Sequence, residues 1–201
     1  MVRAGDELVN PATGLRTVFR ETAETTRGEL LQVDWIGRPG WATGPDHLHP
    51  QQEQRFEVLS GELGLRAGGV ERDHRAGDVV VMPAGTPHAA WNAGAGELHV
   101  LVDFRPALRT ATAFEALTRL ARAGKTTTHG LPRNPLRLAL LLRSFEDEFC
   151  FVVPPPAVQR ALLGPLAAIG RLLGYGTDEF DAAERSLPAR TDDHPTGRRP
   201  L

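Results

Sequence analysis

The feature that most constrains the fold of this chain is a series of short apolar stretches, separated by glycines and prolines, that ends at Pro106. The stretches are rich in Val, Leu and Phe, and turn residues recur about every eight to twelve positions. Each stretch has the length and composition of a β-strand, and strands at this spacing predict a sandwich or a barrel. The predicted strands cover Thr17–Thr22, Glu29–Ile36, Arg55–Leu59, Glu62–Ala67, Val79–Met82, His88–Asn92 and Leu98–Phe104.

The pattern changes to helical spacing after Pro106. Phe114, Leu117 and Leu120 fall on one stripe of a helix. Two more helical segments are predicted, at Leu136–Phe149 and Ala157–Leu173, and each follows a proline that suits a helix start. Gly and Pro residues weaken the last segment as an isolated helix, so we expect packing to hold it.

Three regions follow from these patterns. We expect a mainly β fold with a barrel over residues 10–106, and an α-helical extension over residues 107–175. The apolar stripes of the extension must pack on the barrel, on one another or on a second subunit, and we expect a homodimer. Residues 176–201 are mixed in charge and rich in Arg and Pro, which predicts a flexible tail.

Composition excludes several classes of protein. The 201 residues carry 25 acidic and 23 basic side chains, so the formal net charge is −2. This balance indicates neither a nucleic-acid partner nor a polybasic membrane contact. The single cysteine, Cys150, cannot form an internal disulfide or a thiolate metal site. No apolar leader and no uncharged run of about 18 residues is present, and we expect a cytoplasmic protein.

Two blocks of residues carry chemistry. The first contains His47 and His49, whose imidazoles point the same way in an extended segment, followed by Gln54 and Gly61. The second runs Gly77, Pro83, Gly85, His88 and Asn92, written GDVVVMPAGTPHAAWN. The residue frequencies of this chain give the second pattern a chance expectation of about 0.0001. The second block is therefore a specific signal, whereas the histidine pair alone is a weak one.

These two blocks resemble the two sequence motifs of the cupin superfamily, over about residues 30–104. The resemblance implies a double-stranded β-helix, or jelly roll, with a metal ion inside the barrel. It also implies that His47, His49, His88 and the residue at position 54 are the metal ligands. The residues agree with this, because Pro83 and Gly85 form a tight turn that would bring His88 into a strand facing the first pair.

The chain departs from the family pattern at two positions. Trp41 stands where the pattern has a glycine, which we treat as a small shift in a loop. Gln54 stands at the acidic ligand position, beside Glu53. Strand alternation sends Gln54, Phe56 and Val58 to one face and Glu53 to the other, so Glu53 can replace Gln54 only at a β-bulge.

Replacing the carboxylate by an amide changes the expected chemistry of the site. A divalent ion would keep its full charge among three neutral imidazoles, so metal affinity should fall and Lewis acidity should rise. An anionic substrate oxygen would then be favoured as a further ligand. Gln54 either binds the ion or hydrogen-bonds one of its ligands. The alternative for the trio of His47, His49 and His88 is a barrel without metal, in which these histidines hydrogen-bond a ligand.

Several other side chains are candidates for the pocket or for the surroundings of the metal: Glu53, Phe56, Val58, Trp91 and His99. The apolar ones fit plain core or pocket wall, and His99 fits either a structural histidine or a pocket acid or base.

The extension contains a loop histidine and an acidic run that also need an interpretation. His129 lies in a loop that is either surface or a lid over the barrel mouth. The acidic run Glu146–Glu148 is most simply a solvated face.

The leading functional hypothesis is an enzyme with one divalent metal ion that carries out dioxygenase-type oxidation of a small apolar or aromatic substrate. Iron(II) is expected in that case, because facial coordination by three histidines leaves positions for substrate and O2. A second hypothesis uses nickel, manganese or zinc as a Lewis acid for isomerisation, cyclisation or decarboxylation. A third is a binding module that holds a small molecule without changing it.

Overall fold

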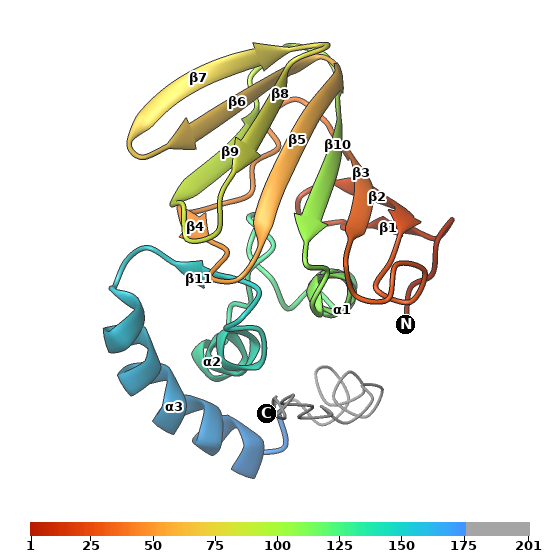
Figure 1. Cartoon of the computed structure of the whole chain (residues 1–201). Coiled ribbons are helices and arrows are strands. Elements are labelled where there is room, and N and C mark those ends of the chain that lie inside the picture. Colours follow the sequence, from red (N-terminus) through yellow and green to blue (C-terminus); the bar gives the residue numbers. More distant parts are fainter. Residues whose placement is uncertain (176–201) are drawn as a thin grey trace, which may run out of the picture.

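The computed structural model describes residues 1–175, with Pro156 described by its backbone alone. Residues 1–105 form ten strands in two antiparallel sheets, and the chain then continues into three helices. This is the expected double-stranded β-helix followed by a helical extension (Figure 1). The tail expected at 176–201 lies outside the described residues.

The first sheet has six strands, and all its pairs are antiparallel. In spatial order they are β1 (Glu7–Val9), β2 (Arg16–Glu21), β3 (Leu31–Gly37), β10 (Leu98–Arg105), β5 (Glu53–Ser60) and β8 (Val79–Met82).

The second sheet has five strands, also antiparallel. Their spatial order is β11 (Cys150–Phe151), β4 (His47–Leu48), β9 (His88–Asn92), β6 (Glu62–Ala67) and β7 (Val70–Arg75). The edge strand β11 belongs to the extension, so the chain after the barrel returns to the sheet that carries the histidine pair.

Alternation along the strands creates the barrel core. In β5 the side chains of Gln54, Phe56 and Val58 are buried while Glu53 is exposed, which confirms the predicted alternation. The inward side chains of both sheets form one apolar cluster that includes Phe19, Leu31, Leu65, Val100 and Phe104.

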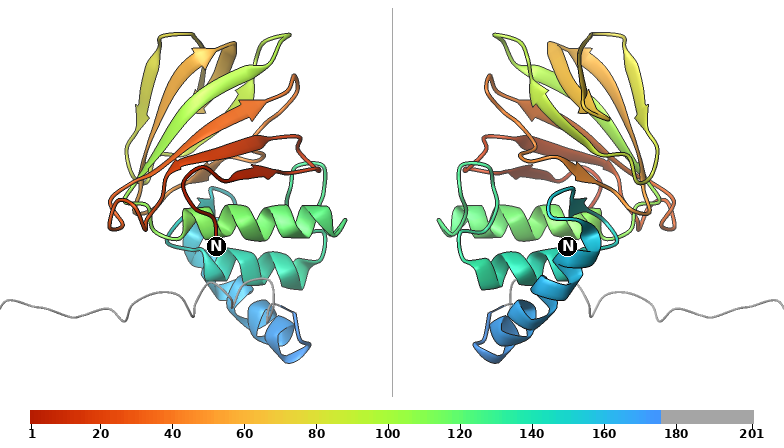
Figure 2. Two further views of the ribbon diagram at one scale, coloured as in Figure 1. Left: turned by 90° about the vertical axis from the view of Figure 1, so that its right-hand side faces the viewer. Right: turned by 90° about the vertical axis from the view of Figure 1, so that its left-hand side faces the viewer.

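The helices are α1 (Thr110–Arg122), α2 (Pro135–Ser144) and α3 (Pro156–Leu172). They lie in layers against one end of the barrel, with α1 next to the strands and α3 outermost (Figures 1 and 2). A second apolar cluster holds them together. Gly170 of α3 lies against α2, because a Cβ there would meet Leu140 Cδ1 at 2.9 Å. Packing therefore supports α3, although Pro165 lies inside it.

The structure differs from the sequence prediction at several strands and at the end of the second helix. The polar segment that includes His74, where no strand was predicted, contains the exposed strand β7, which pairs with β6 along its length. The short strands β1 and β11 were not predicted.

The second helix was expected to reach Phe149 and instead ends at Ser144. Phe145 at its end is fully buried, and the carbonyl oxygen of Ser144 accepts a hydrogen bond from the Arg109 side chain. These contacts end the helix, and the following residues turn back to the barrel.

No helix within residues 1–175 is long and apolar enough to cross a bilayer.

Candidate metal centre

The two sequence motifs meet at adjacent strands. His47 in β4 is the direct register partner of His88 in β9, and His49 follows one residue after the end of β4. Gly85 is in the left-handed region at φ 77°, and its N–H donates to the carbonyl oxygen of His49 at 2.8 Å. This turn therefore joins the second motif to the first and places His88 opposite the histidine pair, as expected from Pro83 and Gly85.

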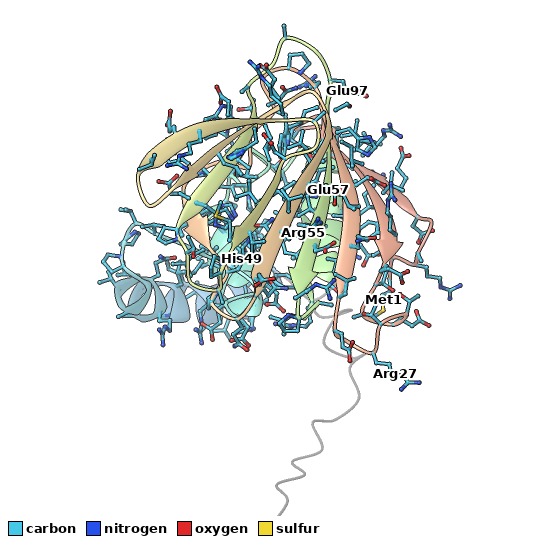
Figure 3. The ribbon with its side chains drawn as sticks, turned by 45° about the horizontal axis from the view of Figure 1, so that its top comes forward. Met1, Arg27, His49, Arg55, Glu57 and Glu97 are labelled. Carbon is cyan, nitrogen blue, oxygen red and sulfur yellow. The ribbon has the colours of Figure 1, made fainter. Side chains whose placement is uncertain are left out.

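The three imidazoles converge. One ring nitrogen from each of His47, His49 and His88 lies within 4.8 Å of the other two. The ring centroids are 5.3 Å apart for His47 and His49, 4.7 Å for His47 and His88, and 5.4 Å for His49 and His88. His49 lies at the helical end of the barrel, whereas Glu97 lies at the opposite end (Figure 3).

Backbone carbonyl groups fix the orientation of all three rings. The Nδ1 atoms lie 3.2 Å from Pro45 O for His47, 2.6 Å from Glu148 O for His49 and 2.8 Å from Thr86 O for His88. A carbonyl oxygen only accepts, so each Nδ1 carries the proton and each Nε2 keeps its lone pair. This is the arrangement in which outer hydrogen bonds orient metal-binding histidines.

Electrostatics keeps the trio neutral. Burial and the neighbouring imidazoles of His49 and His88 lower the pKa of His47 to about 3. Burial and the His88 ring lower the pKa of His49 to about 4. Burial also lowers the pKa of His88 below its usual value. The three Nε2 lone pairs are therefore free of protons near neutral pH.

The donor set fits a divalent metal ion. His49 Nε2 is one of four buried side-chain atoms in residues 1–175 that have no hydrogen-bond partner. A buried acceptor without a donor costs free energy, and a cation bound by the three Nε2 atoms would remove that cost. Three imidazoles suit zinc, iron, nickel or copper better than magnesium, calcium or manganese, so among the expected ions the residues fit iron, nickel and zinc.

Gln54 lies directly beside the trio. Its side chain is 1% exposed, and its Oε1 is 2.8 Å from His88 Nε2. In the neutral ring with Nδ1 protonated, these two atoms are both acceptors. A shared cation would resolve the conflict, and in the metal-free protein a rotated amide would do so by donating from its NH2 group. Gln54 is thus placed to bind the ion or to hold His88.

An apolar cavity opens beside the trio at the helical end of the barrel. Its volume is about 160 Å³. His47 and His49 line it together with Trp35, Phe104 and Phe114. Residues after the barrel supply much of the wall, including α1, the loop at His129–Leu131 and the segment before β11. Helix α1 and these two segments therefore border the cavity at the barrel mouth, and His129 lies in one of them.

The remaining predicted residues are not gathered at the metal centre. Glu53 is exposed on the outer face of β5. Phe56 is buried with its ring centroid 6.3 Å from that of His88, and Val58 lies deeper in the core. Trp91 is half-buried on the face of β9 opposite to His88, where its ring covers Gly64.

His99 lies in an ion-pair network away from the cavity. Its Nε2 is 2.8 Å from Asp34 Oδ1, and Arg20 holds the same carboxylate through two hydrogen bonds of 2.7 and 3.0 Å. Burial alone would raise the pKa of Asp34, but the hydrogen bonds from Arg20 and His99 lower it below its usual value. This placement corresponds to the structural assignment of His99 and not to a pocket acid or base.

Two cavity residues were missed from the sequence. Trp41, treated as a loop shift, is 3% exposed, lines the cavity and packs edge-on against Trp35 at 5.6 Å. Glu148, assigned to a solvated acidic face, is 2% exposed and also lines the cavity. The departure from the family pattern was a usable signal for Trp41. Nothing near Glu148 marked it, because its burial depends on where α2 ends.

The fold and the site agree with the comparison against protein families. Residues 35–104 match the family described as the cupin domain. The matched segment resembles a cupin domain and contains both histidine motifs.

Several solved structures are similar to this chain. A protein with a double-stranded β-helix domain from Klebsiella pneumoniae is 26% identical, with 40% of this chain and 70% of that one covered and a TM-score of 0.38. KdgF from Halomonas sp. is 25% identical, with 46% of this chain and 79% of that one covered and a TM-score of 0.41. A predicted oxalate decarboxylase from Thermotoga maritima is 21% identical over 53% and 98%, with a TM-score of 0.46. No curated protein sequence matched the chain.

Proposed function

We propose that this protein is a metal-dependent enzyme that uses dioxygen to oxidise a small apolar or aromatic molecule. The observation that supports this proposal most directly is the convergence of three oriented, neutral imidazoles beside an apolar cavity. A bound divalent ion, iron(II) in this proposal, would supply a cationic centre where substrate and O2 meet. His47, His49 and His88 would hold that ion on one side, which leaves positions toward the cavity.

The surrounding residues then have defined tasks. The carbonyl oxygens of Pro45, Thr86 and Glu148 keep the imidazoles in the ligating tautomer. Gln54 adds no negative charge, so the site favours an anionic oxygen on the substrate, such as an enolate, phenolate or carboxylate. Trp41 and α1 at the barrel mouth would limit access of water, which strengthens electrostatic interactions inside.

The test is oxygen consumption by protein that has been stripped with a chelator and reloaded with iron(II). A panel of small phenols, enols and aromatic acids is offered, and a His88→Ala variant serves as the inactive control. Substrate-dependent oxygen consumption in the wild type alone supports the proposal. Conversion of a compound without oxygen consumption instead supports Lewis-acid isomerisation or decarboxylation, and binding without conversion supports a non-catalytic module.

Two further expectations stay predictions. The cytoplasmic location depends on sequence composition alone. The homodimer is compatible with the apolar side chains that α3 exposes, among them Val158, Leu162 and Leu172. Sedimentation analysis measures the oligomeric state directly, and a monomer at micromolar concentration would contradict the expected dimer.

A further inference from the structure

Residues with unsatisfied polar atoms are concentrated at the cavity. Among residues 1–175, four buried side-chain atoms have no hydrogen-bond partner: Thr22 Oγ1, Trp35 Nε1, His49 Nε2 and Glu148 Oε2. Three of these four residues line the cavity. Buried polar groups are almost always satisfied in folded proteins, so their collection at one cavity indicates that something else completes them.

The three atoms differ in what they require. His49 Nε2 is the lone pair that a metal ion would take, as described above. Trp35 Nε1 is a donor only, so it requires an acceptor. Glu148 Oε2 belongs to a carboxylate and requires a donor. A metal ion alone satisfies the first atom and leaves the other two without partners.

The Glu148 carboxylate is divided between two tasks. Its Oε1 accepts from the backbone N–H of Arg109 at 3.0 Å and from Arg109 Nε at 3.2 Å, beside the N-terminus of α1. This half of the carboxylate holds the extension together. Its Oε2 is buried with the rest of the side chain, which is 3% exposed, and makes no hydrogen bond.

The indole of Trp35 also has one satisfied part and one unsatisfied part. Its rings pack against Trp41, Phe56, Phe104 and Phe114, with centroids 5.6 to 6.2 Å away. These contacts fix the ring in the core at the cavity wall. They satisfy its apolar surface and leave the N–H without an acceptor.

We infer that the cavity selects a ligand with a hydroxyl or amino hydrogen for Glu148 Oε2 and an acceptor oxygen or nitrogen for Trp35 Nε1. The ligand class is thus a hydroxylated or aminated small ring compound, and Glu148 and Trp35 determine specificity for it. The inference deepens the proposed function, on which it rests for the small-molecule site. A hydrogen bond to a charged group is worth about tenfold or more in affinity.

The test compares probes that differ in one hydrogen-bonding group. Benzoate, hydroxybenzoates and methoxybenzoates, each substituted at ring position 3 or 4, are titrated calorimetrically into the whole chain. The hydroxyl group donates and accepts, the methoxy group only accepts, and the parent compound lacks both. For at least one ring position, the wild type should bind the hydroxy compound about tenfold more tightly than the methoxy compound.

Two variants assign the preference. Glu148→Gln retains Oε1 for Arg109 and replaces the free acceptor by a donor, so the preference for hydroxy over methoxy should disappear. Trp35→Phe retains a ring in the core and should abolish any preference for methoxy over parent. Glu146→Gln is the matched control, since Glu146 is 40% exposed and pairs with Arg143 outside the cavity. It should behave as the wild type does.

The outcomes separate this inference from the proposed metal chemistry. Titrations are run on metal-loaded and on chelator-treated protein, with metal content measured in both. A preference for the hydroxy compounds that Glu148→Gln removes supports the inference, with or without metal in the protein. If the protein retains no metal, only the proposed function is refuted. Equal affinity for all probes, no binding of any probe, or a preference that survives Glu148→Gln overturns the inference.

Discussion

The cavity has two walls of different origin. The barrel wall carries His47 and His49, which cluster with His88, and all three come from local motifs with fixed spacing. The wall from the extension carries α1, Glu148 and Phe149, which no motif marks. The barrel wall thus supplies the ligands for an ion, whereas the extension adds shape and hydrogen-bonding groups. The difference teaches that the residues able to hold an ion come from recognisable motifs, whereas much of the cavity's shape comes from residues that no motif marks.

The two walls are nevertheless coupled at the trio. The carbonyl oxygen of Glu148 accepts from His49 Nδ1, and β11 pairs with β4 so that Phe151 is opposite His47. Gln52, between the first motif and β5, donates to the carbonyl oxygen of Pro106 and to Thr110 Oγ1, both at 2.8 Å. The extension therefore supports the orientation of the ligands.

The largest effect is expected from loss of one imidazole. His88→Ala removes one of three ligands and should lower metal affinity by about a hundredfold or more, at the upper end of effects seen for outer contacts. Competition with a chromophoric chelator measures this. His74→Ala is the control, because His74 lies in β7 outside the trio, and it should leave affinity unchanged. Equal loss in both variants would contradict the assignment.

The coupling between the walls should appear in stability. Gln52 is fully buried, and Gln52→Leu leaves its acceptors and the Thr110 hydroxyl without partners. The free energy of unfolding should fall by about 2 kcal/mol. Gln51→Leu removes one exposed contact to Asp147 and should cost about 0.5 kcal/mol or less. Urea denaturation distinguishes the two, and similar losses would mean that Gln52 does not join barrel and extension.

The charge of the barrel wall is tested by Gln54→Glu. A carboxylate 2.8 Å from His88 Nε2 adds one negative charge beside the ion, so metal affinity should rise about tenfold. The same chelator competition gives the value. Unchanged affinity would show that the amide at this position does not set the affinity of the site.

The free energy of unfolding of the metal-free protein should fall at acid pH, because of the histidines in the barrel. The pKa values of about 3 for His47 and about 4 for His49 lie below the 6.5 of the unfolded chain. The unfolded state therefore binds more protons between about pH 6.5 and pH 4, and stability falls as the pH drops through this window. Urea titrations of chelator-treated protein at several pH values measure it. A flat profile in wild type, or the same slope in a His47→Gln/His49→Gln variant, would refute this cause.

The smallest effect on stability is expected from a substitution at His99, away from the cavity. His99→Gln removes one contact to Asp34, which Arg20 continues to hold. Stability should change by about 1 kcal/mol or less, and metal content should stay the same. Loss of metal in this variant would place His99 in the site after all.

Sequence reasoning succeeded where the signal was local. The strands, the alternation at Gln54 and the turn at Gly85 follow from spacing and from backbone preferences of single residues. The position of Glu148 could not be predicted in this way. It depends on the end of α2, which the burial of Phe145 and a hydrogen bond from Arg109 determine. That hydrogen bond joins two residues 35 positions apart in the sequence, Arg109 and Ser144.

The central claim is that three imidazoles bind one cation. X-ray absorption at the metal edge, on whole protein reloaded with zinc or iron(II), tests it most directly. The account predicts about one ion per chain with three imidazole nitrogens at about 2.0–2.1 Å for zinc. A stripped protein that takes up no ion, or a bound ion with oxygen neighbours and no imidazole scattering, would contradict it.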